Sequence, residues 1–276
     1  MLNVLFSAKP AAWEEYERPL NTAFTKVGLQ VDLSRNHAPQ DVDYIVFAPN
    51  GPVTDFSDYT KTKAVMSLWA GVETVVNNRT LTQPLCRLVD HSLTDGMVEW
   101  VTGHTLRHHL GMDAHIKNQD GIWRETFPPI AANRPVTILG ICALGAACGE
   151  ALHRLGFPVT GWSRAAKDVP GIRCLHGADG LRTALQGAEI VILLLPQTPE
   201  TENILNTNTL ALLAEGAFII NPGRGPLIDD DALLAALDSG QIAHATLDVF
   251  RTEPLPHAHP FWGHSNVTVT PHIAST

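Results

Sequence analysis

The chain has 276 residues, of which 45% are hydrophobic, and it carries a formal net charge of −9. This length and composition suffice for two ordinary domains with filled cores and argue against a disordered chain. The negative charge is spread without a block of like charge, which argues against nucleic acid or an anionic membrane surface as the main partner.

The cysteine content and the N-terminal sequence indicate the compartment. The chain has no C-x-x-C pair and no spacing typical of a disulfide framework or a zinc site among Cys86, Cys142, Cys148 and Cys174. The apolar run from Met1 to Ser7 is too short for a signal peptide, and no segment is long enough to span a bilayer. We therefore expect a cytoplasmic protein with reduced thiols, no bound metal and no membrane partner.

Residues 1–91 alternate between strand and helix patterns. Strands are predicted at 2–6, 31–33, 44–48 and 64–69, and a helix at 13–27, where apolar residues recur at helical spacing. The alternation is typical of a small α/β unit with a parallel sheet. Because ligands bind beyond the carboxyl ends of such strands, the loop Leu68-Trp69-Ala70-Gly71-Val72-Glu73 is a candidate ligand site, although this segment alone favours a plain βα turn.

A long helix is expected next, from residue 94 to about residue 117. It carries His104 and His108 four residues apart, as in a helical metal site, but no acidic or thiol partner is near in the sequence. The pair fits a packed interface better. The loop from Gly121 to Pro129 contains Trp123 and Phe127, whose exposure would indicate contact with another domain or subunit.

A second and stronger alternation begins at Val136. Its strands are predicted at 136–139, 159–162, 172–175, 190–195, 217–221, 245–249 and 267–270, with helices at 145–155, 180–185, 207–213 and 230–239. Near-continuous apolar strands that alternate with helices indicate a doubly wound parallel sheet.

The first turn of this sheet follows the G-x-G-x-x-G dinucleotide pattern, except that Cys142 occupies the place of the middle glycine. By itself such a turn could be an ordinary βα turn. As the first turn of a doubly wound sheet it predicts a cofactor site with the pyrophosphate at a helix N-terminus, formed by Gly140, Cys142, Ala143, Leu144 and Gly145.

The end of the second strand of this sheet indicates which nucleotide binds. In NAD-binding proteins an Asp or Glu stands there and bonds the ribose 2′-hydroxyl. This chain instead has Ser163 and Arg164, with Lys167 close behind. A hydroxyl donor and a guanidinium suit a 2′-phosphate, so NADP(H) is predicted in preference to NAD(H). The alternative is that Arg164 is a solvated surface residue.

Three more motifs follow strand ends on the same side of the sheet. Arg224 comes after one predicted strand, Asp248 and Glu253 after the next, and His272 after the last. A cation, a carboxylate and an imidazole that converge at these ends suit the reduction of an oxoacid, which needs a carboxylate-binding group and a proton donor.

Together these motifs resemble the D-2-hydroxyacid dehydrogenase family, and most closely its glyoxylate/hydroxypyruvate reductase branch. The resemblance covers nearly the whole chain, and its order and spacing are specific. It rests on Ala70-Gly71-Val72, the turn from Gly140 to Gly145, residues 194–201, Gly223-Arg224-Gly225, residues 247–250 with Glu253-Pro254, and Pro271-His272-Ile273-Ala274.

The resemblance implies an α/β fold with two doubly wound parallel-sheet domains and the active site in the cleft between them. Residues 1–91 would form the smaller, flavodoxin-like substrate domain, normally completed by the C-terminal segment after 271. Residues 92–271 would form the Rossmann-type dinucleotide-binding domain, including a dimerisation arm at about 93–134. The family has a final helix beyond the point where this sequence stops, Thr276.

The resemblance also assigns roles residue by residue. Arg224 would bind the substrate carboxylate and carbonyl oxygen, His272 would protonate the ketone oxygen, and Glu253 would orient His272. Asp248 would hold the nicotinamide carboxamide. The other implied substrate contacts are Trp69, Ala70, Gly71 and Val72, and the other implied cofactor contacts are Leu195, Pro196, Pro222, Gly223 and His272.

The expected activity is NADPH-dependent reduction of a small 2-oxoacid, such as glyoxylate or hydroxypyruvate, to the D-2-hydroxyacid by a homodimer. Trp123 would reach the partner's substrate pocket. Two alternatives stay open: an NAD(P)-sensing binding protein similar to the family's corepressor branch, and an NAD-dependent oxidiser of D-hydroxyacids. Three histidines around Pro260-Phe261-Trp262 are interpreted as part of a solvated loop, because the family's chemistry needs no metal.

Overall fold

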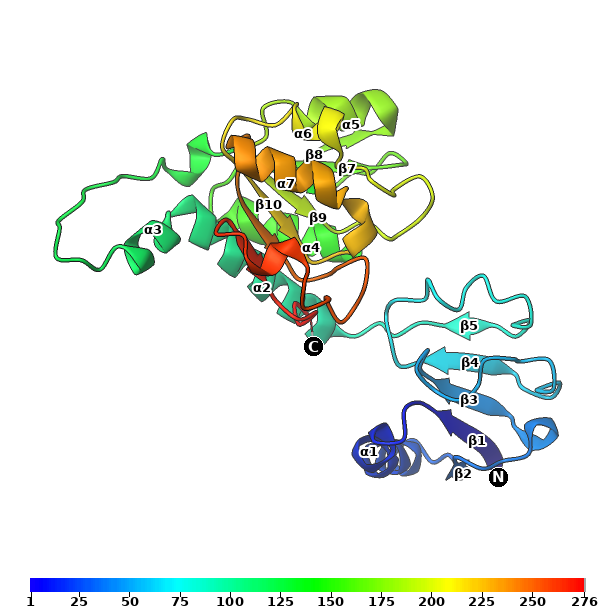
Figure 1. Cartoon of the computed structure of the whole chain (residues 1–276). Helices are drawn as coiled ribbons and strands as arrows, with labels where there is room; N and C mark the ends of the chain where they lie inside the picture. The colour runs from blue at the N-terminus through cyan, green and yellow to red at the C-terminus, as the bar shows by residue number, and fades with distance from the viewer. Residues whose placement is uncertain (276) are drawn as a thin grey trace. The chain divides into compact units, whose positions relative to one another are not determined.

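The computed structural model describes residues 1–275; Thr276 lies outside the described part. The chain divides into two compact units, Met1–Asp90 and a second unit that begins at His91. Each unit is built on one parallel sheet (Figure 1). The predicted fold class, two parallel-sheet α/β domains, is confirmed.

The first unit has a five-stranded sheet in the order β2-β1-β3-β4-β5. Helix α1 (Ala12–Lys26) packs Trp13, Tyr16 and Leu20 onto one face, and the loops around Val53 and Phe56 cover the other. A short 3₁₀ helix, η1, spans Pro39–Asp41. The strands are β1 (Leu2–Ser7), β2 (Val31–Ser34), β3 (Tyr44–Phe47), β4 (Ala64–Ser67) and β5 (Leu85–Cys86).

Strand β4 ends two residues earlier than predicted. The Ser67 hydroxyl donates to the carbonyl of Trp69 at 2.9 Å and lies 3.0 Å from its amide nitrogen. The regular strand therefore ends at Ser67, and the candidate ligand loop begins at Trp69, whose carbonyl also accepts from the Leu88 N–H at 3.2 Å.

The second unit has a seven-stranded sheet in the order β12-β11-β10-β9-β6-β7-β8. Its strands are β6 (Val136–Leu139), β7 (Val159–Ser163), β8 (Arg173–His176), β9 (Ile190–Leu193), β10 (Ala217–Asn221), β11 (Ile242–Leu247) and β12 (Val267–Val269). Its later helices are α4 (Ala143–Arg154), α5 (Gly177–Leu185), α6 (Thr207–Leu210) and α7 (Asp230–Ser239), with the 3₁₀ helices η2 (Ala131–Asn133), η3 (Gly225–Leu227) and η4 (Pro260–Trp262).

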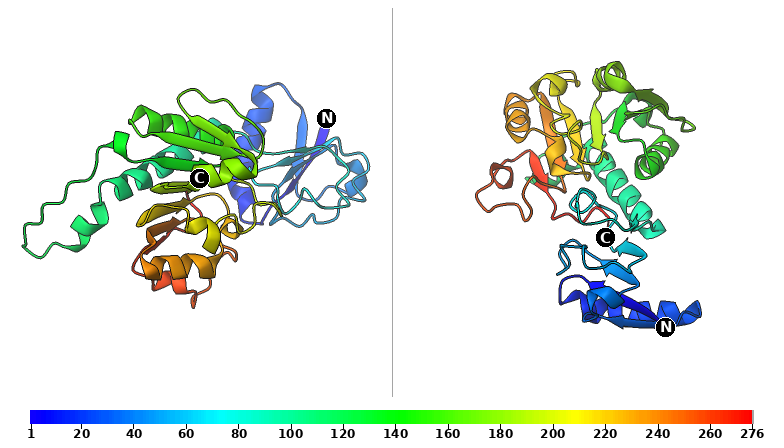
Figure 2. Two further views of the ribbon diagram at one scale, coloured as in Figure 1. Left: turned by 90° about the horizontal axis from the view of Figure 1, so that it is seen from above. Right: turned by 90° about the vertical axis from the view of Figure 1, so that its right-hand side faces the viewer.

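Helices cover both faces of this sheet (Figure 2). In β9, Val191 and Leu193 pack in the core beneath α5, α6 and α7, whereas Ile190 and Ile192 pack in the core beneath α4 and the preceding helix α2 (His91–His109). Successive side chains of a strand face opposite sides, so a strand buried on both faces must be apolar throughout. This explains the apolar runs that identified the sheet.

The prediction of one long helix from residue 94 to about residue 117 is wrong. The structure has two helices, α2 and α3 (Met112–Lys117), separated at Gly111. Gly111 has φ 62°, a left-handed conformation that ends the helical path and that glycine adopts without steric cost.

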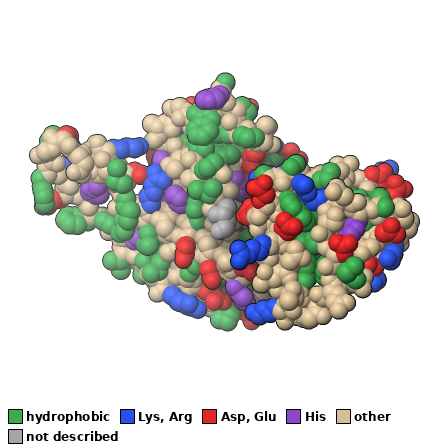
Figure 3. All heavy atoms as spheres, turned by 90° about the horizontal axis from the view of Figure 1, so that it is seen from below, with side chains coloured by type: hydrophobic (Ala, Val, Ile, Leu, Met, Phe, Trp, Pro, Cys, Tyr) green, Lys and Arg blue, Asp and Glu red, His purple; other side chains and the backbone are tan. Residues whose placement is uncertain are grey.

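The segment after α2 forms a projecting arm with exposed apolar side chains. Trp123 and Phe127 have exposed fractions of 89% and 85% in the single chain. Hydrophobic side chains gather on this arm at the left of Figure 3, and further exposed members of the segment are Met112, Ile116, Ile122 and Ile130. Across residues 1–275, no helix combines the length and apolar character needed to cross a membrane.

His108 of α2 and His244 of β11 are buried side by side where α2 packs on the sheet. His108 Nε2 lies 2.9 Å from Thr246 Oγ1, and His244 Nε2 lies 2.8 Å from Thr268 Oγ1. Burial lowers the pKa of His108 to about 3, with the neighbouring His244 and Arg107 adding to the effect. Burial, followed by Arg107, lowers the pKa of His244 to about 4.

We predict from this pair that stability falls as the pH falls from 6.5 towards 4. In this range the unfolded chain binds protons on these histidines and the folded chain does not, so the free energy of unfolding rises with pH. Each such group contributes a slope of up to about 1.4 kcal/mol per pH unit. His108→Gln should lower the slope by about that amount, as measured by denaturant unfolding at several pH values.

The matched control is His257→Gln, because the His257 side chain is exposed. This variant should keep the wild-type slope. An unchanged slope in His108→Gln would contradict the assignment.

Candidate active site

The strand order places a switch point in the second unit. Strand β6 has β7 on one side and β9 on the other, so the chain reverses its direction of growth between β6 and β9. In open parallel sheets, ligands bind beyond the carboxyl ends of the strands at this point. The turns that follow β6 and β9 hold Gly140 and Leu195, two of the predicted cofactor positions.

Close backbone approaches fix the turn after β6. Gly140 has φ 111°, and a Cβ at this position would lie 2.5 Å from the carbonyl carbon of Leu194. A Cβ at Gly145 would lie 2.0 Å from the carbonyl oxygen of Gly140. Both positions therefore need glycine, for the turn itself and for the packing of α4 against it.

Cys142 has a different environment. It precedes the first residue of α4 with φ −94° and ψ −160°, an extended conformation open to any residue, and its side chain is exposed. The turn thus accommodates a side chain at the middle position without backbone strain. Ala143 and Leu144 follow in the first turn of α4, where helix N–H groups lack intrahelical partners.

The end of β7 holds the residues predicted to select the nucleotide. Arg164 and Lys167 are exposed, whereas the Ser163 hydroxyl donates to the carbonyl of Ala165 at 2.7 Å. To donate to a phosphate, Ser163 would have to release Ala165. The pKa of Glu200 is lowered mainly by a hydrogen bond from Thr198, and the charge of Arg164 adds to this.

Asn221 shapes the loop that carries Arg224. Its side chain accepts from the Gly223 N–H at 3.1 Å and donates to the Arg224 carbonyl at 3.0 Å. The half-buried guanidinium donates to the Gly223 carbonyl at 2.7 Å. A Cβ at Gly225 would lie 2.0 Å from the carbonyl carbon of Phe250, so this loop packs directly on the loop after β11.

Glu253 connects that loop to His272. One carboxylate oxygen accepts from the Phe250 N–H at 2.9 Å, and the other lies 2.7 Å from His272 Nδ1. A proton on Nδ1 donated to the carboxylate leaves Nε2 as the nitrogen able to exchange a proton with a substrate. His272 has φ 55°, which costs a residue other than glycine roughly 1–2 kcal/mol.

Asp248 lies at the end of β11 with an exposed fraction of 0%. Its oxygens accept from Thr270 Oγ1 at 2.5 Å, from the Ile273 N–H at 2.9 Å and from the Ala274 N–H at 2.8 Å. The carboxylate is therefore bonded to both sides of the turn that carries His272. Its predicted contact with a nicotinamide stays a prediction.

The predicted site residues belong to two units. Trp69, Ala70, Gly71 and Val72 lie in the first unit, whereas Arg224, Glu253 and His272 lie in the second. Within the second unit the structure brings Glu253 into contact with His272, and Gly140 close to the Leu194–Leu195 backbone. Residues 272–275 also lie in the second unit, where Ala274 packs in the core with Met97 and Val101.

Sequence reasoning gave no role to two side chains that shape these loops, Asn221 and Thr270. Both stand directly before a proline at a strand end. Proline has no N–H to donate to the next turn, so a polar side chain just before it is placed to bond the loop instead. A polar residue directly before a proline at a strand end could therefore have identified these two side chains from the sequence.

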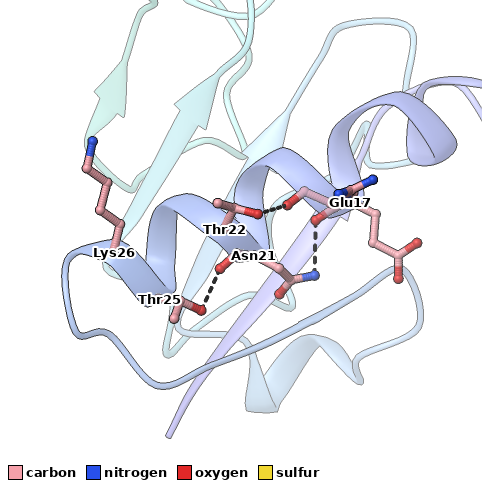
Figure 4. A pocket seen from close by; sticks show the side chains of 6 residues that line it. Glu17, Asn21, Thr22, Thr25 and Lys26 are labelled. Atoms are coloured by element: carbon pink, nitrogen blue, oxygen red, sulfur yellow. Dashed lines mark hydrogen bonds between the residues drawn. The ribbon is translucent and has the colours of Figure 1, made fainter.

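The surface hollow along α1 has no features of an active site (Figure 4). Its lining residues are polar, but three of their side chains bond the helix backbone: Asn21 donates to the Glu17 carbonyl, Thr22 to that of Arg18, and Thr25 to that of Asn21. Among residues 1–275, no three His, Cys, Asp or Glu side chains come together as a metal site.

Comparison with known proteins points to one family. The family model "D-isomer specific 2-hydroxyacid dehydrogenase, NAD binding domain" matches residues 102–274. The chain is similar to glyoxylate/hydroxypyruvate reductase A of Serratia proteamaculans, with 42% identity over 221 residues, 77% of this chain and 71% of the relative. The corresponding protein of Yersinia enterocolitica is 38% identical over 245 residues, 86% of this chain and 78% of the relative.

Solved structures show the same similarity. A D-isomer specific 2-hydroxyacid dehydrogenase from Xanthobacter autotrophicus, in complex with NADPH and MES, has a TM-score of 0.91 and 39% identity, covering 99% of this chain and 88% of that one. An NADPH-dependent glyoxylate/hydroxypyruvate reductase from Sinorhizobium meliloti, in complex with NADP and sulfate, has a TM-score of 0.88 and 34% identity, covering 100% and 90%.

The glycine turn yields a stability prediction. Gly145→Ala should destabilise the protein by about 1–3 kcal/mol, because the new methyl group would overlap the Gly140 carbonyl oxygen. Thermal unfolding measures the effect. Gly263→Ala is the matched control: Gly263 has φ −92°, and the nearest atom to an added Cβ lies 4.0 Å away. Equal melting temperatures for the two variants would show that the turn relaxes around the methyl group.

Proposed function

The chain belongs to the D-isomer specific 2-hydroxyacid dehydrogenase family and is an NAD(P)-dependent enzyme of that kind, and we propose that it reduces small 2-oxoacids, such as glyoxylate and hydroxypyruvate, with NADPH. The observation that carries this proposal is the 2.7 Å contact between Glu253 and His272 Nδ1, on the same sheet edge as the Arg224 loop. An imidazole paired with a carboxylate, and a guanidinium on a loop of the same sheet edge, suit a substrate whose carbonyl oxygen must gain a proton next to a carboxylate.

In this proposal the chain's own residues bind the substrate and supply the proton. The Arg224 guanidinium binds the carboxylate and polarises the carbonyl oxygen. Glu253 holds the Nδ1 side of His272, so that Nε2 delivers its proton to the carbonyl oxygen. NADPH, when bound, supplies the hydride. The backbone groups of residues 69–72 would bind the second carboxylate oxygen.

Three features support NADPH as the cofactor. Gly140 and Gly145 form a turn from which a Cβ is excluded, as a pyrophosphate-binding turn requires. Arg164 and Lys167 follow β7, where a carboxylate would indicate NAD. The similar proteins of Xanthobacter autotrophicus and Sinorhizobium meliloti were solved with NADPH and NADP.

We further propose a homodimer that buries the arm after α2. The support is the group of exposed apolar side chains on this arm, among them Trp123 and Phe127, because exposed apolar side chains that gather in one region mark an interaction surface. Asp120 and Arg124 form a bidentate pair at 2.6 and 2.7 Å on the same loop. In the proposed dimer, Trp123 would reach the partner's substrate pocket.

A cytoplasmic location is also proposed. Its support is that all four cysteines are free thiols, as expected in a reducing compartment.

The function is tested by turnover. When the purified protein is mixed with NADPH and glyoxylate, hydroxypyruvate or pyruvate, the absorbance of the reduced nicotinamide should fall as NADPH is oxidised. His272→Gln should lower kcat by about 100-fold or more, because it removes the proton donor. The exposed His257 supplies the control, and His257→Gln should retain wild-type activity. A wild-type protein that turns over none of the 2-oxoacids would refute the proposal and favour a nucleotide-sensing role.

The cofactor preference is tested at Arg164. Arg164→Ala should weaken NADPH binding by about 10- to 100-fold, the value of one charged hydrogen-bonding partner. NADH binding should change little, because NADH has no 2′-phosphate. Arg154→Ala, at the far end of α4, is the control for loss of an exposed arginine. Equal losses for both cofactors would show that Arg164 does not contact the 2′-phosphate.

A further inference from the structure

We propose that Thr270 and Asp248 are a positioning pair that sets the orientation of His272 towards Glu253. The inference rests on the proposed function of His272 as the proton donor. Neither residue needs to touch the substrate for this role, since both act through the backbone of the turn at residues 270–274.

The contacts of Asp248 surround this turn. Its carboxylate accepts from the Thr270 hydroxyl, the Ile273 N–H and the Ala274 N–H, and its backbone carbonyl accepts from the His272 N–H at 2.9 Å. Its own N–H donates to the Asn221 carbonyl at 3.0 Å, which fixes Asp248 to the end of β10. The histidine is thus held from both sides by one buried residue that is itself anchored in the sheet.

The ion pair between His272 and Glu253 is too exposed to fix its own geometry. The side chains have exposed fractions of 51% and 35%. Pairs of this exposure contribute little net free energy, because water competes for both charges. The backbone that carries the imidazole must therefore set its orientation together with Glu253.

That backbone is held in an unfavourable conformation. His272 has φ 55°, and a residue other than glycine stays there only where its surroundings outweigh the cost. The surroundings that do so are the Asp248 hydrogen bonds and the buried Ala274 that follows. Releasing them would let His272 relax to negative φ and carry its ring away from Glu253.

Thr270 is the member of the pair that can be changed without losing the fold. Asp248→Ala would leave two backbone N–H groups and a hydroxyl unpaired in the core, and the variant could fail to fold. Thr270→Val keeps the shape of the side chain and removes one donor, so the carboxylate keeps its two backbone partners. Thr270→Ser keeps the donor.

The kinetic test compares these variants. Thr270→Val should lower kcat by at least about 10-fold, because misplacing a catalytic group by a fraction of an ångström is costly, while the Kd for NADPH should change by less than about threefold. Thr270→Ser should restore kcat to within about twofold of wild type, since the hydroxyl is present.

The matched control is Thr268→Val on the same strand. The Thr268 hydroxyl contacts Arg107 and His244 instead of Asp248, so this variant should keep the wild-type kcat even if its melting temperature falls.

A second readout does not depend on turnover. In protein labelled with ¹⁵N-histidine, the Nδ1 proton of His272 shared with Glu253 should give a downfield resonance, assigned by its absence in His272→Gln. Thr270→Val should shift or broaden this resonance, and Thr270→Ser should preserve it.

The outcomes separate the two proposals. If the wild type reduces no 2-oxoacid but the resonance depends on Thr270, the proposed function fails and the positioning pair stands. If the wild type is active and Thr270→Val keeps kcat within about twofold, or leaves the resonance unchanged, the positioning pair is overturned.

Discussion

The carboxyl edge of the second unit's sheet depends on backbone segments that approach each other more closely than a Cβ allows. The turn after β6 meets the backbone after β9 at Gly140, α4 meets that turn at Gly145, and the loop after β10 meets the loop after β11 at Gly225. At each of these contacts one loop packs on its neighbour, which restricts the backbone conformations that the loop can adopt. These loops pack on one another as one layer, which holds residues from four different loops in fixed positions relative to each other.

On this layer the buried and exposed charges have different tasks. Asp248 is completely buried, and each of its oxygens is bonded, so it stabilises a backbone conformation that has an intrinsic cost. Glu253 and His272 are partly exposed, so they can exchange a proton. For the same reason, their ion pair contributes little to the free energy of folding. A site that transfers a proton needs both kinds of group. The exposed groups can exchange a proton with the substrate, but water can also reorient them, so a buried group has to hold their backbone in place.

Sequence patterns predicted most of this architecture, and the misses have physical causes. The strands are buried on both faces, so they appear in the sequence as continuous apolar runs, and these runs predicted the sheet. Two positions of the turn leave no room for a Cβ, so they appear as glycines at a characteristic spacing, and this spacing predicted the turn. The helix break at Gly111 was missed because glycine is also tolerated within helices, so only the left-handed φ identifies the end. The buried pair of His108 and His244 joins elements that are distant in the chain, and no local pattern reports such a contact. Side-chain hydrogen bonds such as those of Thr270 depend on angles that spacing does not encode.

Cys142 shows that the glycine fingerprint combines two separate requirements. Gly140 and Gly145 are required by the fold, since a Cβ at either would overlap backbone atoms. The middle position has an extended conformation and an exposed side chain, so the fold accepts cysteine there. A glycine at this place serves only the approach of a ligand. If the Cys142 thiol has a cost, it therefore lowers the affinity for the cofactor and leaves the stability of the fold unchanged. The residue at this position can change the contact with the nucleotide while the backbone geometry at the switch point stays the same.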